Sequence, residues 1–250
     1  MLSQEDIRHY ETEGYVIPDF ALPESTIEGI RRDHAHLLEA HPEFRDYCSA
    51  VLAFDLGFLN YARNPDILDM VEQLIGPDIA LWNSSFFAKP ARDGKRTPMH
   101  QDAAYWPIRP MATCSVWIAV DDSTHENGYL TVIPGSHRER ETRSHDNKPS
   151  EDANLHLEIR GDAYDESKAV GLVLKAGQIS LHNAFLVHGS AANRSDKPRR
   201  AMTLRFMPTT SVYRRDLARP GPNLLNLAQR SLFLMRGIDR SGQNDFRIRH

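Results

Sequence analysis

Apolar residues recur every three or four positions in three stretches of the first 78 residues, a spacing typical of helices. Ser3 and Asn64 precede two of these stretches as N-caps, and Gly14 and Gly76 follow them as stop signals. The expected elements are helices over residues 4–13, 24–40 and 65–75 and a short strand over 15–17. Residues 42–60 fit neither pattern.

Beyond residue 78 the pattern changes to short apolar runs that are separated by turns bearing glycine and proline. These runs predict strands over residues 79–87, 98–103, 113–120, 129–133, 171–174, 178–187 and 201–207. Residues 137–168 carry many charges and few apolar side chains, so we expect a long surface excursion there. Leucines from Leu224 to Leu234 predict a closing helix near the C-terminal end.

Helices followed by many short strands are typical of a β-sandwich or barrel that N-terminal helices support. The length of 250 residues fits one large domain or two small ones, and a domain of this size buries about 70–75% of its unfolded surface. We expect a single, mainly β domain. Its parts would be a helical buttress over 1–78, a β core over 79–208, and a C-terminal loop and helix over 209–250.

Composition narrows the possible partners. The chain has 30 Lys and Arg against 34 Asp and Glu, a net charge of −4, and no basic arm, which argues against nucleic acid as a partner. Its 2 cysteines form no disulfide framework. The acidic N-terminus lacks the apolar segment of a signal peptide, and no apolar run reaches the roughly 18 residues of a membrane span. We therefore expect a cytoplasmic protein.

The most informative polar residues are His100 and Asp102, which lie two positions apart in a predicted strand. If that segment is extended, its alternation puts both side chains on one face, with Gln101 on the other. A histidine and a carboxylate on one face supply two ligands of a 2-His-1-carboxylate site, which holds ferrous iron with positions left open. A second histidine is needed to complete it.

His188 is the best candidate for that histidine, because it closes the apolar run 178–187 and is followed by Gly189 and Ser190. Arg199 begins the next predicted strand, which we expect to run antiparallel to the one ending in His188. A guanidinium beside such a site suits a carboxylate, which it grips through two parallel hydrogen bonds, and the Ser190 hydroxyl would add a third.

With its spacings, this ordered set resembles the phytanoyl-CoA dioxygenase (PhyH) family. The set consists of the His100-x-Asp102 pair, His188, and Arg199 eleven residues after that histidine. Further matching segments are Ser115–Asp122, Asn127–Gly128 and Ile133–His137, so that the resemblance spans about residues 79–208. It implies a double-stranded β-helix, the cupin-like jelly roll, and an oxygenase that depends on iron(II), 2-oxoglutarate and O2.

The resemblance also implies roles for individual residues. The iron ligands would be His100, Asp102 and His188. The residues around 2-oxoglutarate would be Arg199 and Ser190 at its distal carboxylate, with Trp117 and Lys89 as weaker candidates. Related halogenases carry a small residue in place of the carboxylate ligand, so Asp102 favours oxidation of a C–H bond over halogenation.

We therefore expect a dioxygenase that hydroxylates or otherwise oxidises a small metabolite and forms succinate and CO2. Two alternatives stay open: a cupin-like metal-dependent hydrolase or isomerase, which would need no oxoacid clamp, and a non-catalytic metal-binding module. Candidate substrate contacts are Gln101, Tyr105 and Trp106. A polar or anionic substrate is suggested by a basic loop with Arg92, Lys95, Arg96 and Arg109. His137 is interpreted as a residue that stabilises the Pro-Gly-Ser turn. His182 lies six residues before His188, on the same strand face by alternation, and is interpreted as a packing or hydrogen-bonding residue.

Overall fold

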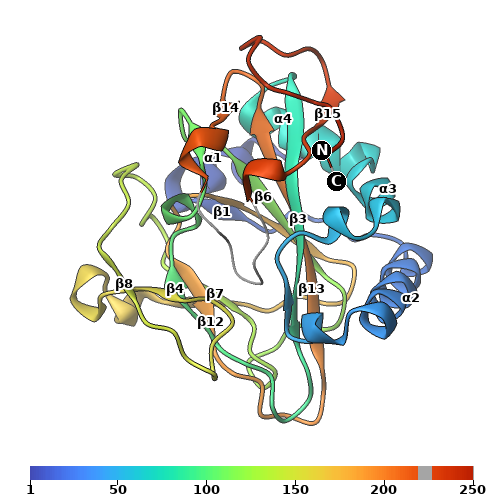
Figure 1. The fold of residues 1–250 in the computed structure, drawn as a ribbon. Coiled ribbons are helices and arrows are strands. Elements are labelled where there is room, and N and C mark those ends of the chain that lie inside the picture. Colours follow the sequence, from blue (N-terminus) through green and yellow to red (C-terminus); the bar gives the residue numbers. More distant parts are fainter. Residues whose placement is uncertain (219–226, 250) are drawn as a thin grey trace.

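A computed structural model describes residues 1–218 and 227–249 and contains a large and a small antiparallel sheet (Figure 1). The large sheet has the strand order β1-β11-β6-β13-β3-β15, with β2 also paired to β3. Its strands are β1 (Tyr15–Val16), β2 (Tyr47–Cys48), β3 (Ile79–Lys89), β6 (Cys114–Ala119), β11 (Ile179–Asn183), β13 (Arg199–Pro208) and β15 (Phe233–Arg236).

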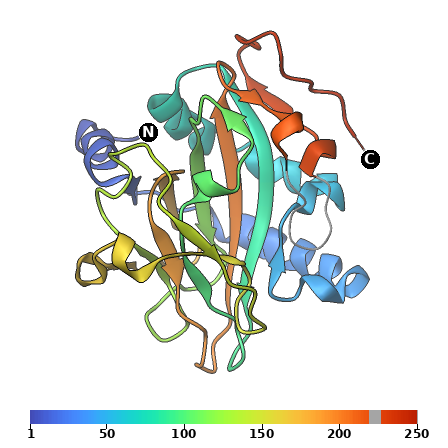
Figure 2. The same cartoon turned by 60° about the vertical axis from the view of Figure 1, so that its left-hand side comes forward.

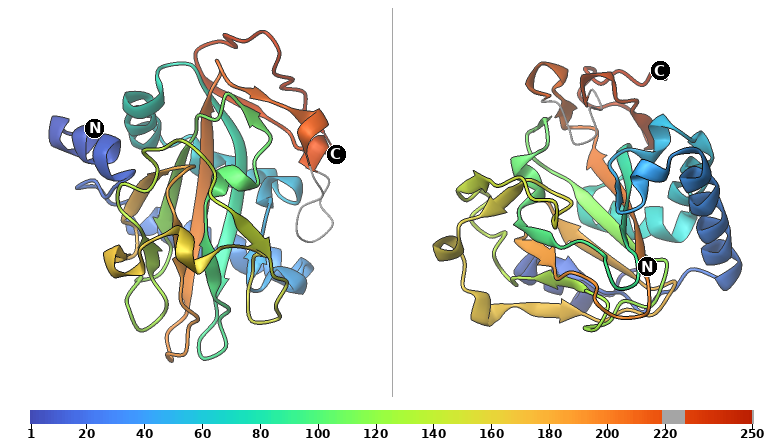
Figure 3. Two further views of the ribbon diagram at one scale, coloured as in Figure 1. Left: turned by 90° about the vertical axis from the view of Figure 1, so that its left-hand side faces the viewer. Right: turned by 60° about the horizontal axis from the view of Figure 1, so that its bottom comes forward.

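The small sheet has the order β10-β7-β12-β4 and lies across the molecule from β3 and β13 (Figures 1 and 3). Its strands are β4 (Thr97–His100), β7 (Leu130–Val132), β10 (Val170–Leu172) and β12 (His188–Ser190). Two further pairs are β5 (Ile108–Arg109) with β14 (Val212–Tyr213), and β8 (His145–Asn147) with β9 (Leu157–Ile159).

The three helices predicted for the first 78 residues are confirmed and pack on the outer face of the large sheet (Figure 2). They are α1 (Gln4–Glu13), α2 (Glu24–Ala40) and α4 (Pro65–Ile75); a short helix that was not predicted, α3 (Leu59–Ala62), joins them. Ser3 caps α1 in a capping box with Asp6, and Gly14 ends it in the left-handed conformation at φ 84°. The segment without a clear pattern forms short 3-10 helices at Pro42–Phe44, Val51–Ala53 and Leu56–Phe58.

Strand alternation divides the large sheet into two chemically different faces. On β13, Met202, Leu204 and Phe206 join the apolar cluster that also contains residues of α2 and α4. The intervening Thr203 and Arg205 point to the opposite face, where they line a cavity between the two sheets. The outer face therefore builds the core, while the inner face is free to carry polar chemistry.

Two predicted strands are shorter than expected. The run 178–187 is not one strand: β11 ends at Asn183, and β12 begins at His188 in the other sheet. The Asn183 side chain accepts a hydrogen bond from the Phe185 amide at 2.9 Å, an Asx turn that breaks the run. Likewise β4 ends at His100, and a 3-10 helix occupies Asp102–Ala104.

The expected pairing of the Arg199 strand with the His188 strand is wrong. β13 lies between β3 and β6 in the large sheet, whereas β12 pairs with β4 and β7 in the small one. The two residues come from facing sheets, which explains how they still approach each other.

The polar segment and the C-terminal tail also differ from the prediction. Residues 137–168 contain the β8–β9 pair and buried Leu155 and Ile159, so the segment packs on the domain and is more than a surface excursion. In the tail, β15 pairs with β3 where a helix was expected, and Leu227–Gln229 form one 3-10 turn; residues 219–226 lie outside the described part. In the described residues, no helix is long and apolar enough to cross a membrane.

Candidate metal and cosubstrate site

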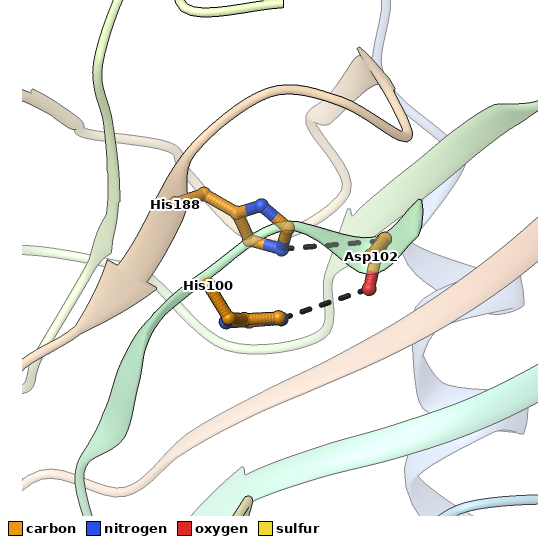
Figure 4. A group of neighbouring side chains, drawn as sticks. All are labelled: His100, Asp102 and His188. Carbon is orange, nitrogen blue, oxygen red and sulfur yellow. Dashed lines mark ion pairs between the residues drawn. The ribbon is translucent and has the colours of Figure 1, made fainter. Parts of the chain in front are cut away.

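His100, Asp102 and His188 come together between the two sheets, with their side chains turned toward one another (Figure 4). His100 ends β4 and faces His188 across the antiparallel pair, with ring centroids 4.3 Å apart. The Asp102 oxygens lie 3.6 Å from Nε2 of His100 and 4.0 Å from Nε2 of His188. One atom from each residue lies within 4.8 Å of the other two, close enough for all three to hold one metal ion.

Each histidine of this group is oriented by a backbone carbonyl. Nδ1 of His100 lies 2.8 Å from the Pro98 carbonyl, and Nδ1 of His188 lies 2.9 Å from the Leu186 carbonyl. A proton on Nδ1 satisfies these contacts, so each Nε2 turns its lone pair toward Asp102. This arrangement of ligand and carbonyl is usual at metal sites.

Burial sets the charge of the group. It lowers the pKa of His188 to about 3, so this imidazole is neutral and ready to bind a metal at pH 7. Burial opposes ionisation of Asp102, but the contact with His100 and the charge of Arg205 outweigh it and hold the pKa of the carboxyl below its usual range. Two imidazoles and a carboxylate are the donor set of a ferrous site.

Gln101 keeps the two halves of the His-x-Asp pair in place. Its backbone is extended, at φ −115° and ψ 129°, so His100 and Asp102 share a face although the strand has ended. Its buried carboxamide donates to the carbonyls of Phe185 and Glu141 and accepts from the amide of Arg143. The structure thus turns Gln101 away from the cavity and ties it to backbone groups, which does not support the expected substrate contact.

Arg199 lies buried at the far wall of the same cavity, with Ser190 and Trp117. Its guanidinium stacks over the Trp117 ring at 5.4 Å and donates to the Ser190 hydroxyl at 3.3 Å. It also donates to the carbonyls of Gly128 and Phe87, so four of its five N–H groups already have acceptors. Among the described residues, the second N–H on Nη1 and the hydrogen of the Ser190 hydroxyl have no acceptor, so these two groups, and not two guanidinium donors as expected from the sequence, are placed to donate to a carboxylate.

Lys89 ends β3 beside Arg199 but does not line this cavity. Its ammonium donates to the Lys95 carbonyl, and burial together with the charge of Arg199 lowers its pKa to about 6. The structure gives no support to a contact between Lys89 and the cosubstrate.

His182 is a further imidazole at the site, which sequence reasoning had placed on the same strand face as His188. It belongs to β11 in the other sheet, yet its Nε2 lies 3.9 Å from Asp102 and its ring centroid lies 5.1 Å from that of His188. Alternation along β11, which sends Leu181 to the core, could have indicated that His182 faces inward.

A second cavity of about 450 Å³ opens on the other side of Asp102. Tyr105 and Trp106, the candidate substrate contacts, both line it. Sequence reasoning missed Arg205, which lines both cavities, although its position six residues after Arg199 puts it on the same strand face.

The basic loop contributes less charge than expected, because its side chains are already partnered. Arg92 pairs with Asp196 at 2.6 Å, and Arg96 pairs with Glu158 at 2.7 Å. Lys95 lies 3.7 Å from Asp46, while Arg109 donates to backbone carbonyls.

Comparison with known proteins places this site in a family. The profile of the family described as phytanoyl-CoA dioxygenase (PhyH) matches residues 10–201. The chain belongs to the PhyH family. It is 32% identical to human peroxisomal phytanoyl-CoA dioxygenase over 166 residues, which are 64% of this chain and 48% of that protein. A probable phytanoyl-CoA dioxygenase of Caenorhabditis elegans is 28% identical over 237 residues, 82% of this chain and 75% of the relative. The chain thus spans about half the length of the human relative.

Solved structures agree with the family assignment and confirm the jelly-roll fold. The non-heme monooxygenase ThoJ in its apo form has a TM-score of 0.76 at 26% identity, covering 95% of this chain and 85% of its own. SnoK, a non-heme α-ketoglutarate-dependent carbocyclase from nogalamycin biosynthesis, has a TM-score of 0.70 at 25% identity, covering 85% and 87%. The family and the donor set of this PhyH protein support iron and 2-oxoglutarate as cofactors.

Proposed function

We propose that this PhyH protein is an iron(II)- and 2-oxoglutarate-dependent dioxygenase that oxidises a C–H bond of a small metabolite and forms succinate and CO2. The observation that carries the proposal is the convergence of His100, Asp102 and His188 on one point, with the buried Arg199 on the same cavity. Together, iron, 2-oxoglutarate and O2 supply the oxidising chemistry that protein side chains lack.

The three proposed ligands would hold the metal ion, and a donor set of this kind leaves coordination positions open. Carbonyl partners keep both imidazoles in the tautomer that presents Nε2, so no rearrangement of the ligands is needed before metal binding. Gln101 supports this geometry from behind through its three hydrogen bonds.

Arg199 and Ser190 would receive the distal carboxylate of 2-oxoglutarate, and Trp117 would line its path. Burial lowers the pKa of Arg199 to about 9, yet the guanidinium stays charged at pH 7, in surroundings where an anion is strongly attracted. The free volume of this cavity is about 30 Å³, less than the cosubstrate needs, so we expect lining side chains to shift when it binds.

Hydroxylation is the reaction that we favour, because Asp102 keeps a carboxylate at the position where the resemblance puts a small residue in halogenases. Desaturation, epoxidation and ring closure use the same cofactors and stay within the proposal. A hydrolase or isomerase would have no use for a buried arginine beside the metal ligands, and Arg199→Ala would leave its activity largely intact. We also keep a cytoplasmic location as part of the proposal, since "peroxisomal" in the names of mammalian relatives describes those proteins.

The test is anaerobic addition of iron(II) and 2-oxoglutarate to the metal-free protein. A visible charge-transfer band is expected, and His188→Ala should abolish it. His125→Ala, which changes an exposed histidine away from the cavity, should keep it. Absence of the band in the unmodified protein, together with absence of succinate over a panel of substrates, would refute the proposed function.

A further inference from the structure

The second cavity beside Asp102 has aromatic walls. Trp82 and Trp106 meet edge to face at 4.6 Å, and Tyr47, Phe87 and Tyr105 complete much of the lining. A volume of about 450 Å³ lies within the usual range for small-molecule sites. Because Asp102 lines the cavity, a molecule bound there would lie next to the proposed metal. The residues that line the cavity therefore indicate which chemical class of substrate fits.

Arg205 projects into this cavity from the inner face of β13, and part of its guanidinium has no hydrogen-bond acceptor among the described residues. It is only 5% exposed and donates through Nη1 to the Ser85 hydroxyl at 2.5 Å. Its Nε is buried without a hydrogen-bond partner. The guanidinium is held between the rings of Trp106, at 5.2 Å, and Phe87, at 5.8 Å. Ring contacts help to fix its position but give Nε–H no acceptor among the described residues, which is costly for a buried cation.

Arg230 adds a second guanidinium from the C-terminal tail, just before β15. It stacks over the Trp82 ring at 5.6 Å and lines the same cavity. Within residues 1–218 and 227–249, no carboxylate lies within ion-pair distance of Arg205 or Arg230. Burial lowers the pKa of Arg230, and the nearby charge of Arg205 acts in the same direction. The cavity thus brings two like charges together, and neither makes an ion pair within the described residues.

Charge balance points to what the cavity lacks. Asp102 is the acidic residue that lines it, and in the proposed oxygenase this carboxylate is used by the metal. The divalent metal, Asp102, Arg199 and the doubly charged 2-oxoglutarate together sum to zero. The charges of Arg205 and Arg230 are then left over, and an anion bound between them would offset the cost of bringing two cations to one cavity.

We propose that this cavity binds the oxyanion group of an organic acid, a carboxylate or phosphate, between Arg205 and Arg230. The apolar body of the acid would lie against the tryptophan walls and present its reactive C–H bond near Asp102. The substrate class is therefore a small acid with an aromatic or similarly flat apolar body. This assignment rests on the proposed function for the reaction, but the anion site itself can be tested by binding alone.

The experiment measures binding by calorimetry to the protein loaded with nickel(II), which replaces iron without oxidation, and 2-oxoglutarate. The probes are 3-phenylpropionate, phenyl phosphate and the neutral 3-phenylpropionamide. We expect at least one of the two acids to bind about tenfold or more tightly than the amide, since hydrogen bonds to a charged group carry that much affinity. The acid that binds more tightly identifies the oxyanion.

Arg230→Gln tests the assignment directly. It should lower the affinity for the preferred acid about tenfold and leave the amide unchanged, so that the acid-to-amide ratio approaches one. Arg214→Gln is the matched control, because Arg214 is exposed and paired with Asp216 at 2.6 Å. Thermal unfolding of both variants checks the fold, and the wild-type ratio is informative even if Arg230→Gln does not fold.

Equal binding of acid and amide to the wild-type protein, absence of binding by both acids, or an unchanged ratio in Arg230→Gln would overturn the anion site. The same preparations are tested for the charge-transfer band with iron(II). A missing band with intact acid selectivity would refute the oxygenase function and leave the anion site standing. An intact band without acid selectivity would do the reverse, so the two failures are distinguishable.

Discussion

Replacing Ser190 by alanine removes one hydroxyl from the proposed cosubstrate site and leaves the neighbouring arginine in place. Ser190 is buried, and its Oγ accepts one hydrogen bond, from Nη2 of Arg199 at 3.3 Å. Nη2 also donates to the Gly128 carbonyl at 2.9 Å, and the Trp117 contact is unaffected. The guanidinium should therefore keep its position, and the fold should lose little stability.

The expected loss is confined to the distal carboxylate of 2-oxoglutarate. With four guanidinium N–H groups of Arg199 already bonded, the Ser190 hydroxyl is among the donors that the described residues can offer to a carboxylate at this end of the cavity. A hydrogen bond to a charged group contributes about 1.5–3 kcal/mol, which corresponds to a roughly 10- to 100-fold rise in Kd for 2-oxoglutarate. Iron binding should not change, because Ser190 is not among the proposed ligands.

Anaerobic titration of the iron(II) protein, followed by the charge-transfer band, measures this loss. Each variant is titrated with 2-oxoglutarate and with 2-oxobutyrate, which has the same oxoacid end and no distal carboxylate. Ser190→Ala should weaken the binding of 2-oxoglutarate and leave that of 2-oxobutyrate unchanged. Ser123→Ala, at a buried serine whose hydroxyl has no partner and does not line the cavity, is the matched control.

Two results would refute the reasoning. An equal loss for both oxoacids would mean that the substitution distorts the metal end of the site. An unchanged affinity for 2-oxoglutarate would mean that its distal carboxylate does not reach Ser190.

Two further predictions concern stability. Gln101→Leu should lower the free energy of unfolding by about 2–4 kcal/mol, because three backbone groups lose a buried partner. Urea denaturation measures this loss, with Gln243→Leu at an exposed position as the control. A loss below about 0.5 kcal/mol would contradict the prediction. Burial lowers the pKa of His34 to about 4 from 6.5, so between these values the unfolded chain binds a proton that the native state does not. The free energy of unfolding should therefore fall by up to about 3 kcal/mol as the pH drops through this window. His34→Leu should flatten the dependence of stability on pH, whereas His36→Leu, at an exposed position, should not. Equal pH dependence in all three proteins would rule out this role for His34.

The sequence by itself determined the elements that depend on neighbours along the chain. Helix α1 begins at the Ser3 cap and ends at Gly14, as expected, because both signals act within one helical turn. His100 and Asp102 lie on one face, as predicted, although the strand itself ends at His100. The backbone of Gln101 alone keeps the extended conformation that puts both side chains on that face. Spacing and resemblance also singled out His188 and Arg199, which the structure brings to the same cavity.

Tertiary structure decided which strands meet. The apolar run ending in His188 looked like one strand, and only the Asx turn at Asn183 sends its two halves to different sheets. That split puts His182 opposite His188 and separates the Arg199 strand from the strand with which it was expected to pair. Register between distant segments depends on burial summed over whole sheets, and no local pattern encodes it.

The same limit applies to the second cavity. Arg205 on β13 and Arg230 in the tail are 25 residues apart in sequence and belong to no motif. Even so, both line the cavity that Trp82 and Trp106 also line, close enough for the charge of Arg205 to lower the pKa of Arg230. Packing brought them together without a carboxylate within ion-pair distance in the described residues. Short spacing therefore singled out two of the proposed metal ligands, His100 and Asp102, whereas the residues that would select the substrate emerged only from long-range packing of the sheets and the tail.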